Sequence, residues 1–164
     1  MNRKQHVVAA VLALGICLGE ANSSRAVSYM LGDQDFAEGY IMSGGTAEFN
    51  GVSAGEPVPF DRIYGSDFGT PFSESWTFSY PATPVVAASL TIGIVDHDSA
   101  ASGLQVASFD LEGNDLTAPL NTLFEATGGT QVENNIYTLS IPAVALAALA
   151  DGSATFTLTL QGPG

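Results

Sequence analysis

Hydrophobic and polar residues alternate in several short stretches of this chain. Side chains of a strand point alternately to its two faces, so such a stretch predicts a strand with one buried face. In one stretch Trp76, Phe78 and Tyr80 share a face, which is expected to pack in the core because aromatic rows in sheets are usually buried. Strands are predicted at 75–80, 85–95, 104–110, 136–141 and 155–161, with shorter candidates at 40–42 and 47–49.

One segment follows a helical spacing instead. Pro142 suits the first turn of a helix, and Leu146 and Leu149 are three residues apart, so a short helix is predicted near 142–150. Gly152 is expected to end it in the left-handed conformation. Repeated short strands separated by turn residues predict an all-β fold. The expected architecture is an antiparallel β-sandwich (jelly-roll or C2/Ig-like) with this one short connecting helix.

The beginning of the chain has the composition of a leader. Arg3 and Lys4 precede an uncharged apolar run at 7–18, whose length fits the core of a signal peptide and falls short of a comfortable membrane span. Small residues place the cleavage after Ala21 or Ala26. An uncleaved anchor is the alternative.

These features predict the domain organisation and the localisation. Residues 1–26 are expected to form a signal peptide and residues 27–164 a single β-sandwich domain. The protein is therefore expected to be secreted, in the extracellular space or at the cell surface. Cys17 is the only cysteine and lies inside the leader, so the domain must be held together by packing, with a metal ion as a further candidate.

The charge of the chain excludes two classes of partner. It carries 17 acidic and four basic residues, a formal net charge of −13, and Arg62 is the only basic residue after position 27. Nucleic acids and anionic membranes are bound through basic patches, so neither is an expected partner. Cation binding, a salty environment and simple solubility by self-repulsion all fit this charge.

Carboxylates gather where predicted strands end. Two aspartates in an Asp-x-Asp spacing follow the strand at 85–95, and two more follow the strand at 104–110. Ca²⁺ takes six to eight oxygen ligands, so Ca²⁺ is a candidate cofactor. Solvated loop acids are the alternative interpretation. The candidate metal ligands are Asp96, Asp98, Asp110 and Asp115, with Asp33 and Asp35 as a further cluster.

Two arrangements of these clusters are open. If the strands at 90–95 and 104–110 are antiparallel neighbours, the acids after the first strand and those after the second lie at opposite ends of the sheet. If the chain instead crosses between the sheets at 99–103, the two clusters can approach each other.

The catalytic signals are weak. His97 is the only histidine after the leader, and no Gly-x-Ser-x-Gly elbow is present. Paired carboxylates, such as Asp96 with Glu112, could serve a small secreted hydrolase if they converged in a cleft. An enzymatic function is therefore left open, and a non-catalytic one is favoured.

An aromatic platform would point to another class of protein. Exposure of Trp76, Tyr64 or Phe68 would indicate a carbohydrate-binding module, because aromatic faces stack against sugars.

Several segments resemble exosortase-sorted (PEP-CTERM-type) secreted bacterial proteins. Besides the basic and apolar leader, they are LGDQDF at 31–36, WTF at 76–78, the stretch 90–99 and the stretch 141–152. The family's sorting tail has a Pro-Glu-Pro motif, an apolar helix and a basic end. This tail is not found before Gly164, so the expectation is either a truncated sequence or a freely secreted relative.

A second resemblance concerns calcium. The stretch 90–98, with alternating Leu90, Ile92 and Ile94 before Asp96 and Asp98, is similar to the strand and calcium loop of C2-type β-sandwiches. This resemblance implies Ca²⁺ at the acidic turn.

The sequence therefore predicts a secreted or cell-surface, non-catalytic β-sandwich module with an extracellular structural or adhesive role, stabilised by calcium. The expected partners are extracellular polysaccharide or surface proteins. A carbohydrate-binding module is the first alternative, and a small secreted hydrolase that uses paired carboxylates is the second.

Overall fold

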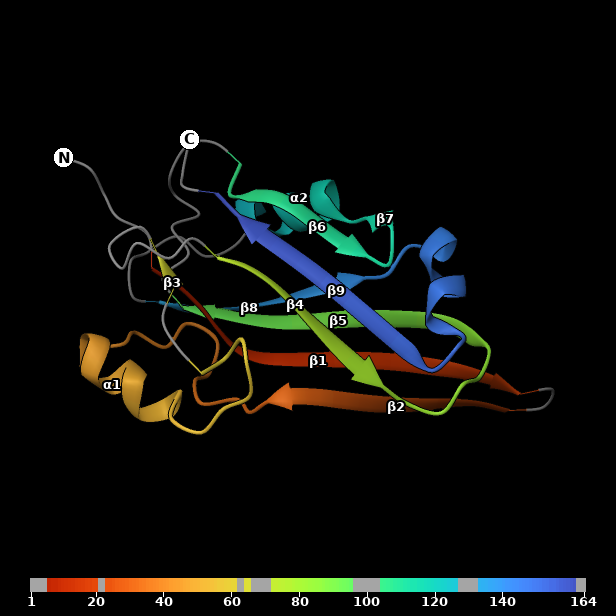
Figure 1. The fold of residues 1–164 in the computed structure, drawn as a ribbon, viewed down its shortest axis with the longest axis horizontal. Coiled ribbons are helices and arrows are strands. Elements are labelled where there is room, and N and C mark those ends of the chain that lie inside the picture. Colours follow the sequence, from red (N-terminus) through yellow and green to blue (C-terminus); the bar gives the residue numbers. More distant parts are fainter. Residues whose placement is uncertain are drawn as a thin grey trace.

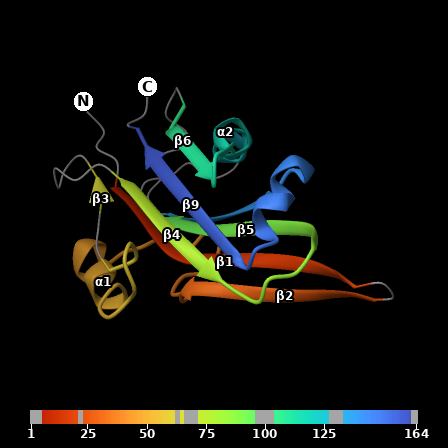
Figure 2. The same ribbon diagram turned by 45° about the vertical axis from the view of Figure 1, so that its right-hand side comes forward.

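Two antiparallel β-sheets pack face to face in this protein (Figure 1). The computed structural model describes residues 6–20, 23–61, 64–65, 72–95, 104–126 and 133–161. The strands of one sheet cross those of the other obliquely, and a view turned by 45° shows the second sheet lying over the first (Figure 2). The predicted all-β sandwich is confirmed.

The first sheet has the strand order β2-β1-β5-β8. Leu14 pairs with Tyr29 on one side and with Leu90 on the other, and Leu90 pairs with Leu139, so one row of side chains faces the core across four strands. This alternation fixes the register, because a shift by one residue would turn every apolar side chain outward. The strands are β1 (His6–Glu20), β2 (Ser23–Gly32), β5 (Val85–Val95) and β8 (Asn134–Ser140), with the short β3 (Tyr64–Gly65) beside β1.

The second sheet has the strand order β4-β9-β6-β7. Its strands are β4 (Ser73–Ser79), β6 (Val106–Leu111), β7 (Asn114–Asp115) and β9 (Ser153–Leu160). The rings of Trp76, Phe109 and Phe156 stack, with centroids 5.7 to 6.4 Å apart. Trp76 is 5% and Phe78 is 2% exposed, so the aromatic face of β4 lies in the core, as predicted.

Three helices connect the strands in the described part of the chain. The predicted connecting helix is present as the 3-10 helix η2 (Ala143–Leu149), which follows Pro142 and buries Leu149. The α-helices are α1 (Gly45–Val52) and α2 (Thr117–Ala126). No helix among the described residues is both long enough and apolar enough to cross a membrane.

The short strand predicted at 47–49 was wrong, because these residues belong to α1. The carboxylate of Glu48 accepts a hydrogen bond from the Gly44 backbone N–H (2.6 Å), which satisfies one of the free N–H groups at the helix start. Phe49 is buried in a small cluster that also contains Val95 at the end of β5. In the stretch 40–42, Ile41 forms a single β-bridge to Glu133.

A tight corner joins the end of β4 to the connection between η2 and β9. The Tyr80 hydroxyl lies 2.9 Å from the Leu149 carbonyl oxygen and 2.8 Å from that of Ser153, and the Tyr80 N–H donates to the Gly152 carbonyl (2.8 Å). Gly152 has φ +94°, the left-handed conformation that the sequence predicted, but it lies three residues after η2 ends at Leu149. A Cβ at this position would overlap the Tyr80 carbonyl oxygen and lie 2.9 Å from the Ala82 nitrogen.

β1 contains most of the segment predicted as a signal peptide. The sandwich therefore begins before the predicted boundary at residue 27, and Leu14 and Ile16 are 0% and 1% exposed. An uncharged apolar run suits a leader, and it equally suits a central strand whose inward side chains enter the core. Cleavage after Ala21 or Ala26 stays a prediction, and it would remove β1 from between β2 and β5.

Candidate functional site

The strands that precede two of the predicted acidic segments, β2 and β5, end at the same end of the first sheet. β2 and β5 both run antiparallel to β1, so they point in the same direction, and Gly32 and Gly93 both pair with Val11. Asp33 directly follows β2 and Asp96 directly follows β5. Asp96 and Asp98 themselves lie outside the described residues, and their role as ligands stays a prediction.

The segment after β2 crosses this end of the sheet and is fastened to β8. The side-chain Nδ2 of Asn134 donates to the carbonyl oxygens of Phe36 (3.3 Å) and Ala37 (3.0 Å). The Gly39 N–H donates to the Asn134 carbonyl, and the Asn134 N–H donates to the Tyr40 carbonyl, both at 2.8 Å. Residues 36–40, which follow Asp33 and Asp35, are therefore held against Asn134, the register partner of Val95 at the end of β5.

Carboxylates repel one another on this segment. Partial burial raises the pKa of Asp35, and the negative charges of Asp33 and Glu56 raise it further. Arg62, the one basic residue after the leader, lies outside the described residues. A bound cation would relieve the repulsion, because it favours the ionised form of each neighbouring carboxyl group.

Two buried amide oxygens lie at the start of β8, on consecutive residues whose side chains point to opposite faces of the strand. Asn134 and Asn135 are each 1% exposed, and their Oδ1 atoms have no hydrogen-bond partner among the described residues. Because the Nδ2 of Asn134 donates to two carbonyls, its amide group cannot be flipped to satisfy the oxygen. Such orphaned acceptors are rare in native proteins and are often explained by a water or an ion.

These two asparagines were not among the ligands predicted from the sequence. Their signal was available, since Glu133, Asn134 and Asn135 follow one another directly before a predicted strand. The Nδ2 of Asn135 donates to the Glu133 carboxylate (3.3 Å), and the Glu38 carboxylate accepts from the Ile136 N–H (2.5 Å). Oxygen-rich side chains therefore surround the start of β8 on both sides.

Asp110 and Asp115 are not part of this group. β5 and β6 belong to different sheets, so the chain crosses between the sheets after Val95, yet β6 runs back and carries these aspartates to the far end of the sandwich (Figure 1). The Asp110 carboxylate accepts from the Gly113 N–H (2.7 Å) within a turn. The Asp115 carboxylate accepts from the Thr117 N–H (2.9 Å) at the start of α2, and hydrogen bonds from Thr117 lower the pKa of Asp115.

A metal site is not complete within the described residues. No group of three or more His, Cys, Asp or Glu side chains in that part of the chain is arranged to hold an ion. Any ion at the acidic end of the first sheet would therefore need ligands from amide oxygens, backbone carbonyls or water, or from residues in the undescribed ranges.

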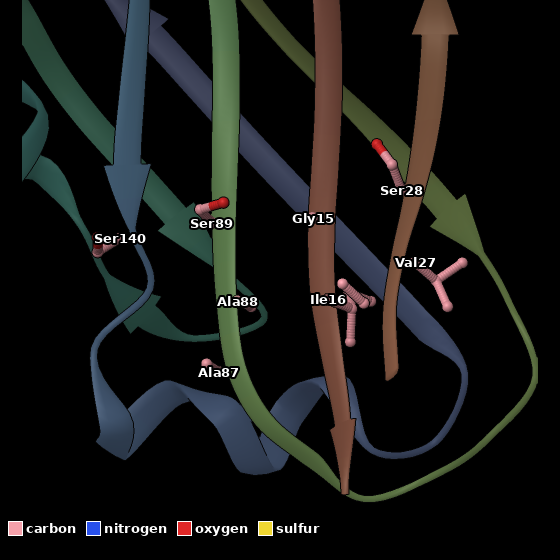
Figure 3. A pocket seen from close by; sticks show the side chains of 9 residues that line it. Gly15, Ile16, Val27, Ser28, Ala87, Ala88, Ser89 and Ser140 are labelled. Atoms are coloured by element: carbon pink, nitrogen blue, oxygen red, sulfur yellow. The ribbon is translucent and has the colours of Figure 1, made fainter. Parts of the chain in front are cut away.

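A shallow trough of about 520 Å³ lies on the outer face of the first sheet (Figure 3). Ser28, Gly15, Ser89 and Ser140 come from four adjacent strands and form its central row. The described residues that line it include no ionisable side chain, so they offer no acid, base or nucleophile activated by a neighbouring base.

A second trough, of about 550 Å³, lies along α2 and includes Asp115 and Glu125. These carboxylates sit at the two ends of the helix, and at 1.5 Å per residue they are separated by about 12 Å or more along its axis. Glycosidases hold their carboxylates within roughly 5–10 Å, so this pair does not fit the predicted hydrolase. Asn121, which also lines the trough, uses its amide to bond both the N–H and the carbonyl of Val106 (3.0 Å each).

The aromatic residues of β4 do not form a platform, because Trp76 and Phe78 are buried. Phe68 and the side chain of Tyr64 lie outside the described part of the structure. A comparison of this chain with protein-family models, curated proteins and solved structures finds no match. The class of protein is therefore defined by the fold, an antiparallel β-sandwich with an acidic end on its first sheet.

Proposed function

We propose that this protein is a non-catalytic β-sandwich module of the extracellular space or cell surface, stabilised by Ca²⁺ and serving a structural or adhesive role. The observation that carries the proposal is the acidic end of the first sheet. There Asn134 at the start of β8 holds the segment that follows Asp33 and Asp35, and the Oδ1 atoms of Asn134 and Asn135 are buried without a hydrogen-bond partner among the described residues.

Calcium is the cation that best suits these groups. Ca²⁺ prefers hard oxygen ligands, accepts carboxylate and amide oxygens together, and tolerates irregular geometry with six to eight ligands. Cys17 is the only cysteine of the chain, so a thiolate-rich transition-metal site is not supported. Asp96 and Asp98, which follow β5 in the sequence, are the proposed completing ligands.

The non-catalytic part of the proposal is supported by the two troughs. The described lining of one has no ionisable side chain, and the other separates its two carboxylates by about the length of a helix. Secretion is supported by the basic and apolar composition of the first 26 residues. The strongly negative charge supports partners other than nucleic acids and anionic membranes.

Thermal melting of the full chain in excess Ca²⁺ and in chelator tests the proposal. At about 100 times its dissociation constant, a ligand of the native state stabilises by roughly 2.7 kcal/mol. For a chain of this length that corresponds to a rise in Tm of about 5–10 °C. The rise should be lost in the double variants Asp33→Asn/Asp35→Asn and Asp96→Asn/Asp98→Asn.

A matched control removes the same number of charges at the far end of the sandwich. Asp110→Asn/Asp115→Asn keeps an oxygen acceptor in the turn and at the helix start, so it should change the Tm in chelator little and keep the full shift in Ca²⁺. Equal melting in Ca²⁺ and chelator, or an equal shift in all three double variants, would refute the calcium site.

A further inference from the structure

The outer face of the second sheet carries only hydroxyl side chains on two neighbouring strands. Burial alternates along β4 and β9, so every second residue of each strand points away from the core. We call this surface the hydroxyl face. Its residues are Ser73, Ser75, Thr77 and Ser79 of β4 and Ser153, Thr155, Thr157 and Thr159 of β9.

The hydroxyl groups of this face are ordered by bonds across the two strands. Three pairs of hydroxyl oxygens lie within hydrogen-bond distance, at 2.9, 2.7 and 2.9 Å. The paired residues are Ser73 with Thr159, Ser75 with Thr157 and Thr77 with Thr155. These pairs are also the register partners of the strands, so the rows repeat about every 6.8 Å along the strands, and the two strands are about 4.8 Å apart.

Each pair keeps hydrogen-bonding capacity for a partner. A hydroxyl group has one donor and two acceptor sites, so a bond between two hydroxyls leaves one O–H donor and three lone pairs per pair. Because each pair fixes its own rotamers, a partner that binds here pays less side-chain entropy than one that must order free side chains.

The chemistry of this face selects one kind of partner. It has no charged residue, although the chain carries a net charge of −13, so neither a cationic nor an anionic partner gains an ion pair there. Large apolar and aromatic side chains anchor protein interfaces, and this face has none. Asp110 and Glu112 lie beside β9 and bound the neutral area on one side. No described helix lies in front of the face in either view (Figures 1 and 2).

We propose that the hydroxyl face of β4 and β9 binds a neutral polysaccharide, whose own hydroxyl groups exchange hydrogen bonds with the paired serines and threonines. This inference rests on the adhesive role proposed above and names its partner class. It differs from the usual aromatic platform, because the aromatic side chains of β4 are buried on the opposite side of the strand.

Depletion of the full-length chain by microcrystalline cellulose, as a neutral polysaccharide surface, tests this proposal. The variant Thr77→Val/Thr155→Val/Thr157→Val keeps the β-branched shape and removes one or both hydroxyls from two pairs. It should bind about ten-fold more weakly, since each lost hydrogen bond is worth a modest free energy and ten-fold corresponds to 1.4 kcal/mol.

A matched control lies on the other sheet. Thr91 and Thr138 form the same kind of hydroxyl pair at 3.0 Å, so Thr91→Val/Thr138→Val should leave binding to cellulose unchanged. The unmodified protein should bind the anionic polymer polygalacturonate more weakly than it binds cellulose, because the protein is itself acidic and like charges repel.

Three results would overturn the proposal. The first is that cellulose does not deplete the unmodified chain. The second is that the triple valine variant, with an unchanged circular dichroism spectrum, binds as well as the unmodified chain, and the third is that the control variant loses as much binding as the triple variant. Binding to cellulose that survives the triple variant would leave an adhesive function standing and place its site elsewhere, whereas no binding to any surface would count against both.

Discussion

Among the positions that we describe, Gly152 at the corner between η2 and β9 is the one where a substitution should lower the stability of the fold most. Its φ of +94° lies in the region that favours glycine, and an added Cβ would meet the backbone of the segment after β4 rather than a movable side chain. We predict that Gly152→Ala destabilises the fold through both effects.

Gly113 provides the matched comparison. Its φ of +86° is nearly the same, but a Cβ there would meet nothing within 4 Å. A residue other than glycine in a left-handed conformation costs about 1–2 kcal/mol, and both variants incur this cost. Forcing atoms into a packed region adds about 1–3 kcal/mol, and only Gly152→Ala incurs that. The expected losses are therefore about 1–2 kcal/mol for Gly113→Ala and about 2–5 kcal/mol for Gly152→Ala.

Urea titration followed by circular dichroism measures both variants under one condition. Native domains are stable by only about 5–15 kcal/mol, so a loss near the upper value would be visible as a large fall in the midpoint. If both variants lost the same free energy of unfolding, the close approach at Gly152 would have no energetic weight and the reasoning would be refuted.

Three further predictions concern hydrogen bonds and charge. Tyr80→Phe removes the hydroxyl that bonds two carbonyls at the same corner and should lower the free energy of unfolding in urea by about 1 kcal/mol; an unchanged midpoint would contradict this. Asn121→Leu leaves the buried N–H and carbonyl of Val106 unpaired and should lower the free energy of unfolding by about 2–4 kcal/mol in the same assay. Unaltered stability would contradict this. The raised pKa of Asp35 means that its ionisation destabilises the folded chain as the pH rises above the ordinary value of 3.8. In chelator, Asp35→Asn should therefore melt higher than the unmodified chain at pH 7 and equally below pH 3.8, and equal melting at both pH values would show that the repulsion is negligible.

The strands β4, β8 and β9 could be predicted because their apolar and polar residues alternate strictly. In β9 the residues Phe156, Leu158 and Leu160 all face inward, as the pattern indicated, and Tyr137 and Leu139 of β8 do the same. The two α-helices were missed for a physical reason. α1 buries little more than Phe49, so its apolar pattern is too sparse to show a helical period.

The candidate site was only partly visible in the sequence for a different reason. Acidic pairs can be read along the chain, but the sequence alone left open which of the preceding strands end on the same side of the sandwich. That depends on β2 and β5 running in the same direction, and on Asn134 fastening the segment after β2 to β8. The buried asparagines carry no charge and follow no familiar spacing, so only the structure indicated their oxygens as candidate ligands of a cation.

The position of β1 has a consequence for self-association. Both edges of β1 are paired, one with β2 and the other with β5, while β5 pairs on its far side with β8. A chain that begins at residue 27 would lack β1, so the edge of β5 between Val85 and Val95 would be unpaired. This strand carries the apolar Leu90, Ile92 and Ile94. Unpaired edges are templates for a strand from another molecule. Two forms of this protein that differ only in the leader would therefore differ in their tendency to pair with a second copy.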